Sequence, residues 1–155
     1  MRRLPELIAA SPVFAGLGEE ELHVIARCGR NVRFAEGELL ASEGDPADTF
    51  YLVRRGRVAL ELHQPDRGGL VIDTADPGDV VGWSWLVPPY RWHFDARAAE
   101  PVAAVAFDGA CLRRRCEDDP FLGYELMKRF AQVIVDRLQH TRFRLLDVYG
   151  GVGAR

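Results

Sequence analysis

The central part of the chain, between residues 31 and 108, has a two-residue period and frequent glycines, and this pattern most constrains the fold. Val58, Leu60 and Leu62 alternate along one segment, and Gly56 precedes it at the position of a turn. Short strands separated by glycine turns are typical of a small antiparallel sandwich, roll or barrel. We therefore predict an α+β chain that is mainly β, with strands at 32–34, 39–41, 50–54, 58–62, 70–74, 80–81, 95–98 and 102–107.

Helical patterns flank this central part. A helical lead-in is expected within the first 30 residues, where three glutamates before an apolar run suit the positive end of a helix dipole. After the strands, Asp108 can cap a short helix, and Pro120 occupies the first position of a long helix that reaches Val148. We divide the chain into the lead-in 1–30, a ligand-binding β domain 31–108, C-terminal helices 109–148 and a flexible tail 149–155.

The long helix carries apolar residues with a mean spacing of 3.5, which is the period of a coiled-coil seam and predicts a homodimer. A second apolar edge contains Leu122, Leu126 and Val133, so the alternative is that both edges pack within one subunit. The predicted interface residues are Met127, Phe130, Ile134, Leu138, Thr141 and Leu145.

Composition argues against several classes of protein. The net charge of −3 gives no basic footprint for nucleic acid, and the arginines at 113–115 are expected on a solvated helix face. Three cysteines without a CxxC motif indicate neither a disulfide framework nor a zinc site, and reduced thiols fit a cytoplasmic protein. No apolar run reaches membrane-spanning length, and Pro5 and Glu6 interrupt the N-terminal apolar stretch, which argues against a signal peptide.

The stretch from residue 77 to 98 is the best candidate for a ligand site. It holds all three tryptophans and interleaves aromatic residues with arginines. Aromatic faces offer stacking and cation–π contacts, and arginine offers paired donors, so a planar or anionic small ligand would fit here. The alternative is that most of these aromatics fill the core of the β domain. The candidate ligand-binding residues are Gly82, Trp83, Ser84, Trp85, Tyr90, Arg91, Trp92 and Arg97.

Four segments follow one another in a distinctive order. They are PVFAGLGEEEL, VRFAEGELLASEGDPADTFYLVRRGRVAL, PGDVVG and the long run that starts at Pro120. Together they resemble the cyclic nucleotide-binding domain family, as found in Crp/Fnr-type bacterial regulators, over roughly residues 11–146. The resemblance implies an eight-stranded, jelly-roll-like antiparallel β-roll with N-terminal helices, a phosphate-binding cassette at residues 78–98 and a long C-terminal dimerisation helix.

The cassette departs from the family pattern at two positions. In family members that bind cyclic nucleotides, a glutamate after the cassette glycine holds the ribose, and a later arginine pairs with the phosphate. Here Trp83 follows Gly82, and the arginine position falls on Trp92 with Arg91 beside it. The alternative is that the loop register shifts by one and Arg91 makes the phosphate contact. Since an indole only donates hydrogen bonds, cyclic AMP is not expected in the usual mode. The chain also stops soon after the long helix, so the family's helix-turn-helix domain and direct reading of DNA are not expected.

We therefore expect a non-enzymatic regulatory module with no catalytic residues, no cofactor, no metal, and no DNA or membrane partner. It would form a homodimer, bind a small ligand at the cassette and signal through its dimer helix. The alternative is a ligand-free protein-interaction module whose cassette is occluded. A metalloenzyme of the related cupin architecture would need clustered histidines. The histidines here are scattered, at His23, His63, His93 and His140.

Overall fold

Two antiparallel sheets form the centre of the molecule. The computed structural model describes residues 3–66 and 68–153. One four-stranded sheet has the order β1-β8-β3-β6 and the other the order β2-β7-β4-β5. Every predicted segment is a strand, so the prediction of an antiparallel β-roll is confirmed. The strands are β1 (Gly29–Phe34), β2 (Leu39–Ala41), β3 (Thr49–Arg55), β4 (Val58–Gln64), β5 (Gly68–Ala75), β6 (Val80–Val81), β7 (Asp95–Ala98) and β8 (Val102–Asp108).

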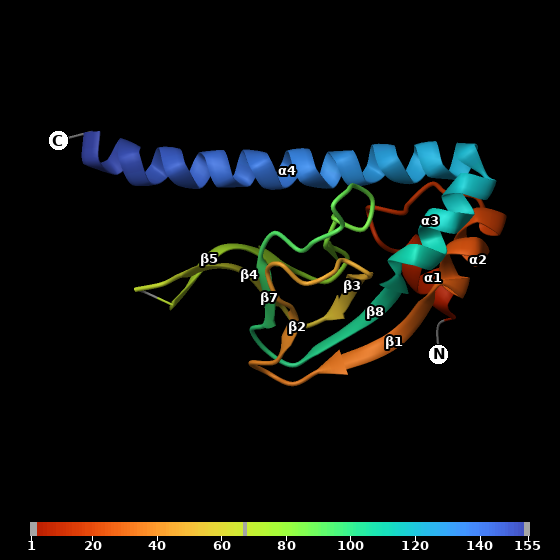
Figure 1. Cartoon of the computed structure of the whole chain (residues 1–155), viewed down its shortest axis with the longest axis horizontal. Helices are drawn as coiled ribbons and strands as arrows, with labels where there is room; N and C mark the ends of the chain where they lie inside the picture. The colour runs from red at the N-terminus through yellow and green to blue at the C-terminus, as the bar shows by residue number, and fades with distance from the viewer. Residues whose placement is uncertain (1–2, 67, 154–155) are drawn as a thin grey trace.

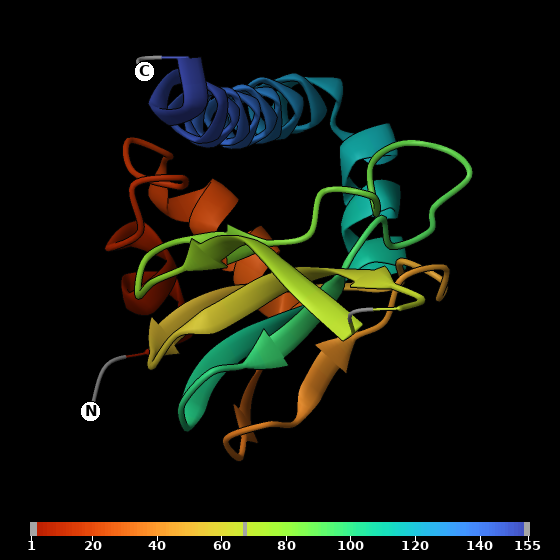
Figure 2. The ribbon, with the colours of Figure 1, turned by 90° about the vertical axis from the view of Figure 1, so that its left-hand side faces the viewer.

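The helices take two positions around the β-roll. Figure 1 shows α1, α2 and α3 gathered at one end of the roll, whereas α4 runs along its side. In the perpendicular view of Figure 2, α4 lies above the sheets, with the N-terminal segment on one side and the loop between β6 and β7 beside α3. The helices are α1 (Leu4–Ala9), α2 (Glu19–Arg27), α3 (Gly109–Asp118) and α4 (Pro120–Gly153).

The ends of the C-terminal helices follow from local sequence. Asp108 caps α3 because its side chain accepts a hydrogen bond from the Cys111 N–H at 3.0 Å. Pro120 is the first residue of α4, as predicted. The helix was predicted to end at Val148 and to be followed by a flexible tail, 149–155. Both predictions are wrong up to Gly153, because α4 continues to that residue. No proline interrupts this run, and each added residue gains a backbone hydrogen bond. Residues 154 and 155 lie outside the described part. Among the residues that the structure describes, no helix is long and apolar enough to cross a membrane.

Strand β3 lies between two apolar cores. Phe50 and Leu52 face a core shared with the helices, whereas Tyr51 and Val53 face a second core inside the β-roll. This alternation follows from the two-residue period of a strand. The interior of the roll is therefore filled with side chains next to β3. Whether the cassette has room for a ligand depends on this packing.

The prediction of three reduced cysteines is wrong. Cys28 and Cys111 are joined by a disulfide with Cα atoms 5.8 Å apart, although 83 residues separate them in sequence. The reason lies in the pairing of β1 with β8, in which Gly29 faces Phe107. Cys28 immediately precedes β1, and Cys111 follows β8 in the first turn of α3. In the described residues, only Cys116 remains a free thiol.

Candidate functional site: the cassette and the helix that covers it

The cassette loop, residues 82–94, joins β6 to β7 by turns and contains no helix. It begins at Gly82, whose φ of +101° lies in the left-handed region that favours glycine. A Cβ built on Gly82 would lie 2.6 Å from Cη2 of Trp92, so the indole ring packs directly against the backbone of the cassette glycine. Only glycine fits here, because any larger residue would both strain the backbone and collide with the indole.

Trp92 is a core residue of the β-roll. Its exposed fraction is 4%, and its ring lies edge-on to Phe94 with centroids 5.7 Å apart. Its backbone N–H donates to Asp45 O at 2.9 Å, and its carbonyl accepts from Gly44 N–H at 2.8 Å. These contacts fix Trp92, the residue that we expect from the sequence at the family's arginine position. An apolar ring therefore occupies the place where the resemblance implies a phosphate-binding cation.

The other two tryptophans also pack inward. Trp85 is 1% exposed and stacks on Phe50, with centroids 4.8 Å apart and planes at 15°. Trp83 is half-buried, contacts both cores and lies 5.2 Å from Phe94. Ser84 between them is buried. The geometry therefore gives Ser84 and Trp85 a position in the core, which is the alternative expected from the sequence, while Trp83 is the tryptophan with part of its surface open.

Both candidate arginines already have partners. Arg97 donates from Nε to Glu61 Oε1 at 3.0 Å and from Nη1 to Gly37 O at 2.7 Å. Arg91 is exposed and donates from Nη1 to Gly44 O at 3.2 Å. Arg97 is therefore engaged by a carboxylate, whereas Arg91 spends one of its donors on a neutral carbonyl and lies at the surface. Their role as ligand-binding residues stays a prediction.

Arg113 is a cassette contact that the sequence did not reveal. Its Nη1 donates to Trp85 O at 2.6 Å, and its guanidinium lies 4.4 Å from the centroid of the Tyr90 ring. Tyr90 itself has a φ of 56°, which is unusual for a residue with a side chain. The prediction that residues 113–115 are all solvated is therefore wrong for Arg113, which ties α3 to the cassette loop. In the sequence, the sign of this contact would have been a cation on the side of α3 that carries the apolar Leu112.

Helix α4 presents one apolar edge to the body of its own chain. Phe130 is fully buried and lies edge-on to Phe14, Phe50 and Trp85. The prediction of Phe130 as an interface residue is therefore wrong, because its ring fills the core shared by helices and sheet. The remaining predicted residues stay predictions: Met127, Ile134, Leu138 and Thr141 are exposed, and the side chain of Leu145 lies outside the described ones.

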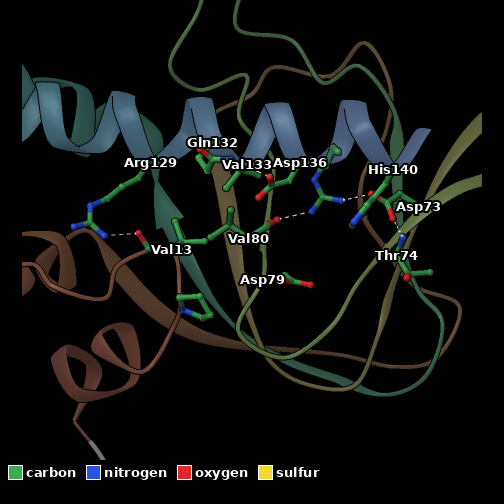
Figure 3. Close-up of a pocket in the computed structure, with 12 residues that line it drawn as sticks. Val13, Asp73, Thr74, Asp79, Val80, Arg129, Gln132, Val133, Asp136 and His140 are labelled. Atoms are coloured by element: carbon green, nitrogen blue, oxygen red, sulfur yellow. Dashed lines mark hydrogen bonds and ion pairs between the residues drawn. The ribbon is translucent and has the colours of Figure 1, made fainter. Parts of the chain in front are cut away.

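Two arginines fasten α4 to the rest of the molecule (Figure 3). Arg137 pairs with Asp73 of β5 at 3.0 Å and also donates to Val80 O at 2.8 Å. Arg129 donates to the carbonyls of Val13 and Ala15 at 2.8 and 2.7 Å. A cavity of about 310 Å³ lies between these two anchors, beneath α4. Sequence reasoning missed both anchors because their partners lie 64 and more than 110 residues away.

Burial raises the pKa of two side chains among the described residues. Burial, with help from Asp119 and Glu117, raises the pKa of the free Cys116 thiol, so it is less often a thiolate. Burial likewise raises the pKa of Tyr51, against an opposing effect of Arg30. In the part of the chain that the structure describes, no group of three or more histidine, cysteine or acidic residues could hold a metal ion.

The two sheets, the loop between β6 and β7 and the long C-terminal helix define a β-roll domain. Residues 31–119 match the sequence profile described as "Cyclic nucleotide-binding domain". The chain therefore belongs to the cyclic nucleotide-binding domain family, and its relatives include regulators of the Crp/Fnr kind.

Two curated relatives and one solved structure illustrate the match. The chain is 25% identical over 145 residues to the CRP-like cAMP-activated global transcriptional regulator of Mycobacterium tuberculosis, covering 94% of this chain and 63% of that one. It is 30% identical over 135 residues to the nitrogen fixation regulation protein FixK of Bradyrhizobium diazoefficiens, covering 87% and 54%. The chain thus spans less than two thirds of both curated relatives. A Geobacter metallireducens structure named as a cyclic nucleotide-binding protein has a TM-score of 0.80 and 31% identity, covering 88% of this chain and 99% of that one.

Proposed function

We propose that the chain is a non-enzymatic, cytoplasmic regulatory module whose cassette is closed by its own tryptophans and which pairs with a second copy through α4. The observation that carries the first part is the contact between the Trp92 ring and the backbone of Gly82. Of the two functions expected from the sequence, the occluded cassette is the one that this contact supports. The output is then read from the surface of the module rather than from a bound cyclic nucleotide.

The energetics of the cassette support occlusion. A cyclic nucleotide held in the family manner would need Trp92 to leave its buried position, and losing the burial of a tryptophan typically costs about 3–5 kcal/mol. At Arg97 the ligand's phosphate would have to compete with Glu61, which is already paired with that guanidinium. The ribose would find Trp83 in place of a carboxylate. Each of these terms opposes binding in the family manner.

The exposed edge of α4 supports pairing with a second copy. Met127, Ala131, Ile134 and Leu138 form an apolar stripe with spacings of 4, 3 and 4 residues, and Leu138 is 59% exposed. Ala131 thus takes the place in the seam that was predicted for Phe130. The neighbouring edge with Leu126 and Phe130 is already buried in its own subunit, so the stripe is left for a partner helix with the same repeat. A heptad seam of this kind suits two identical helices.

The cassette is tested by isothermal titration calorimetry with cyclic AMP and cyclic GMP, checked by thermal shift, since a ligand of the folded state raises the melting temperature. We expect neither heat of binding nor a shift. The M. tuberculosis regulator, which is named as cAMP-activated, is the positive control for the assay. Saturable binding that Trp92→Ala changes would overturn the occluded cassette and restore the ligand-sensing alternative.

The pairing is tested by sedimentation velocity at micromolar concentration. We expect a dimer for the wild-type chain and a monomer for Leu138→Glu, which places a charge in the apolar stripe. Gln139→Glu is the matched control, because it adds the same charge one residue away on an exposed position outside the stripe. A wild-type monomer, or equal effects of the two variants, would contradict pairing through this edge.

A further inference from the structure

The Cys28–Cys111 disulfide joins the end of α2 to the first turn of α3. Cys28 is the residue that ends α2, and its carbonyl accepts from Asp108 N–H at 2.8 Å just before α3 begins. The covalent bond therefore holds the start of α3 against the N-terminal layer. An element fixed in this way at its first turn can change position when the bond opens.

The disulfide can be reached from solvent. It borders a cavity of about 390 Å³ between the α2–β1 junction and the start of α3. Cys28 is buried, whereas Cys111 is only half-buried, so an incoming thiol meets the Cys111 sulfur first. The charged side chains that line this cavity balance in number: Arg27, Arg30, Asp48 and Asp108. A small thiol of either charge can therefore enter.

Helix α3 contacts the cassette loop close to this bond. Arg113, two residues after Cys111, donates to Trp85 O and covers the Tyr90 ring. Gly109 packs so closely on Trp85 that a Cβ at Gly109 would lie 2.9 Å from the tryptophan Cβ. The same helix connects to α4 through the single residue Asp119. A shift of α3 would therefore be transmitted to both the cassette loop and α4.

We infer that the Cys28–Cys111 bond is a redox site, opened by a small thiol of the glutathione class, and that its opening loosens the hold of α3 on the cassette loop. Disulfides in a reducing compartment are usually transient and redox-sensing, which fits a bond placed at such a junction. The inference rests on the cytoplasmic location proposed above, but not on the occluded cassette or on the dimer, since it concerns α3 and its two neighbours.

The exchange balances in two steps. The thiolate of the incoming thiol attacks the Cys111 sulfur, the sulfur–sulfur bond breaks, and Cys28 leaves as a thiolate that takes up a proton. The thiolate of a second small thiol then attacks the small-molecule sulfur of the mixed disulfide. The bond to Cys111 breaks, Cys111 leaves as a thiolate that takes up a proton, and one oxidised small disulfide is released. Two small thiols lose two electrons and two protons, and the protein gains both. Cys116 is a poor participant because its pKa is raised.

The first test counts thiols by alkylation and mass spectrometry of the unfolded chain, starting from protein purified without reductant. With three cysteines in the chain, we expect one alkylated thiol before, and three after, incubation with reduced glutathione. Three alkylated thiols at the start would overturn the inference, because no bond would then exist in the folded protein. A single thiol after incubation would also overturn it, because the bond would then be closed to small thiols.

The second test follows amide hydrogen exchange in the cassette loop and in α3, before and after reduction. We expect exchange to become about tenfold faster in both segments on reduction. The variant Cys28→Ser/Cys111→Ser should exchange like the reduced protein and ignore glutathione, whereas Cys116→Ser should respond like wild type. If the double variant does not fold, the coupling is still tested by comparing exchange before and after reduction in the wild type and in Cys116→Ser. Unchanged exchange in the cassette loop after complete reduction would refute the coupling.

Discussion

The ion pair between Arg137 and Asp73 gives the sharpest stability prediction, because it fastens α4 to β5. Their side chains are 14% and 13% exposed, and Arg137 also satisfies Val80 O. Replacing Arg137 with methionine keeps the apolar stem but leaves Asp73 Oδ2 and Val80 O without their donor. Breaking a buried pair from one side costs about 3–5 kcal/mol, and the residual exposure favours the lower end, about 3 kcal/mol. For a chain of this size, that corresponds to a fall in Tm of about 6–12 °C.

The assay is urea unfolding, combined with a double-mutant cycle that includes Asp73→Ala. The double variant should lose less than the sum of the single variants, with a coupling energy of about 2 kcal/mol. The matched control is Arg57→Ala, since Arg57 pairs with Asp76 at a similar distance of 2.9 Å but on the open surface, and its loss should leave Tm unchanged. A loss for Arg137→Met no larger than that of the control, or a coupling near zero, would refute a fastening role for this pair.

Three further predictions concern the core, the cassette and the disulfide. Phe130→Ala should cost about 3–5 kcal/mol of unfolding free energy in urea titrations, whereas Leu138→Ala should leave the stability of the monomer nearly unchanged; equal losses would contradict the assignment of the two edges of α4. Gly82→Ala should destabilise by more than about 1 kcal/mol, through its positive φ and its contact with Trp92, and a neutral result in thermal unfolding would argue against that contact. Reduction of Cys28–Cys111 should lower the unfolding free energy by about 2–5 kcal/mol, and an unchanged urea midpoint would mean that the bond is absent.

Local periodicity was sufficient to predict the strands and the caps. Alternation along segments such as 58–62 depends only on a strand having two faces, and the Asp108 cap depends only on its place before a helical run. The same reasoning could not decide the role of Trp92. Inside a roll, the side chain of a pocket residue and the side chain of a core residue both point inward. Only the contacts of Trp92 with Gly82 and Phe94 show that it is a core residue.

The differences at Phe130 and at the cysteines depend on pairings between distant residues. The helical spacing of α4 fits Phe130 on either apolar edge, and the rings of Phe14 and Trp85 decide which edge is buried. The disulfide follows from the register of β1 against β8, which the number and spacing of the cysteines do not contain. Sequence patterns describe single elements, so contacts that join two elements were the ones missed.

The most direct test of the occluded cassette is the environment of Trp92 itself. In the variant Trp83→Phe/Trp85→Phe, Trp92 is the only tryptophan left, and its emission and acrylamide quenching can be measured with and without cyclic AMP and cyclic GMP. We predict blue-shifted emission that acrylamide barely quenches and that neither nucleotide alters. Red-shifted, readily quenched emission that changes saturably with a cyclic nucleotide would show that the indole leaves the cassette, and would contradict the account.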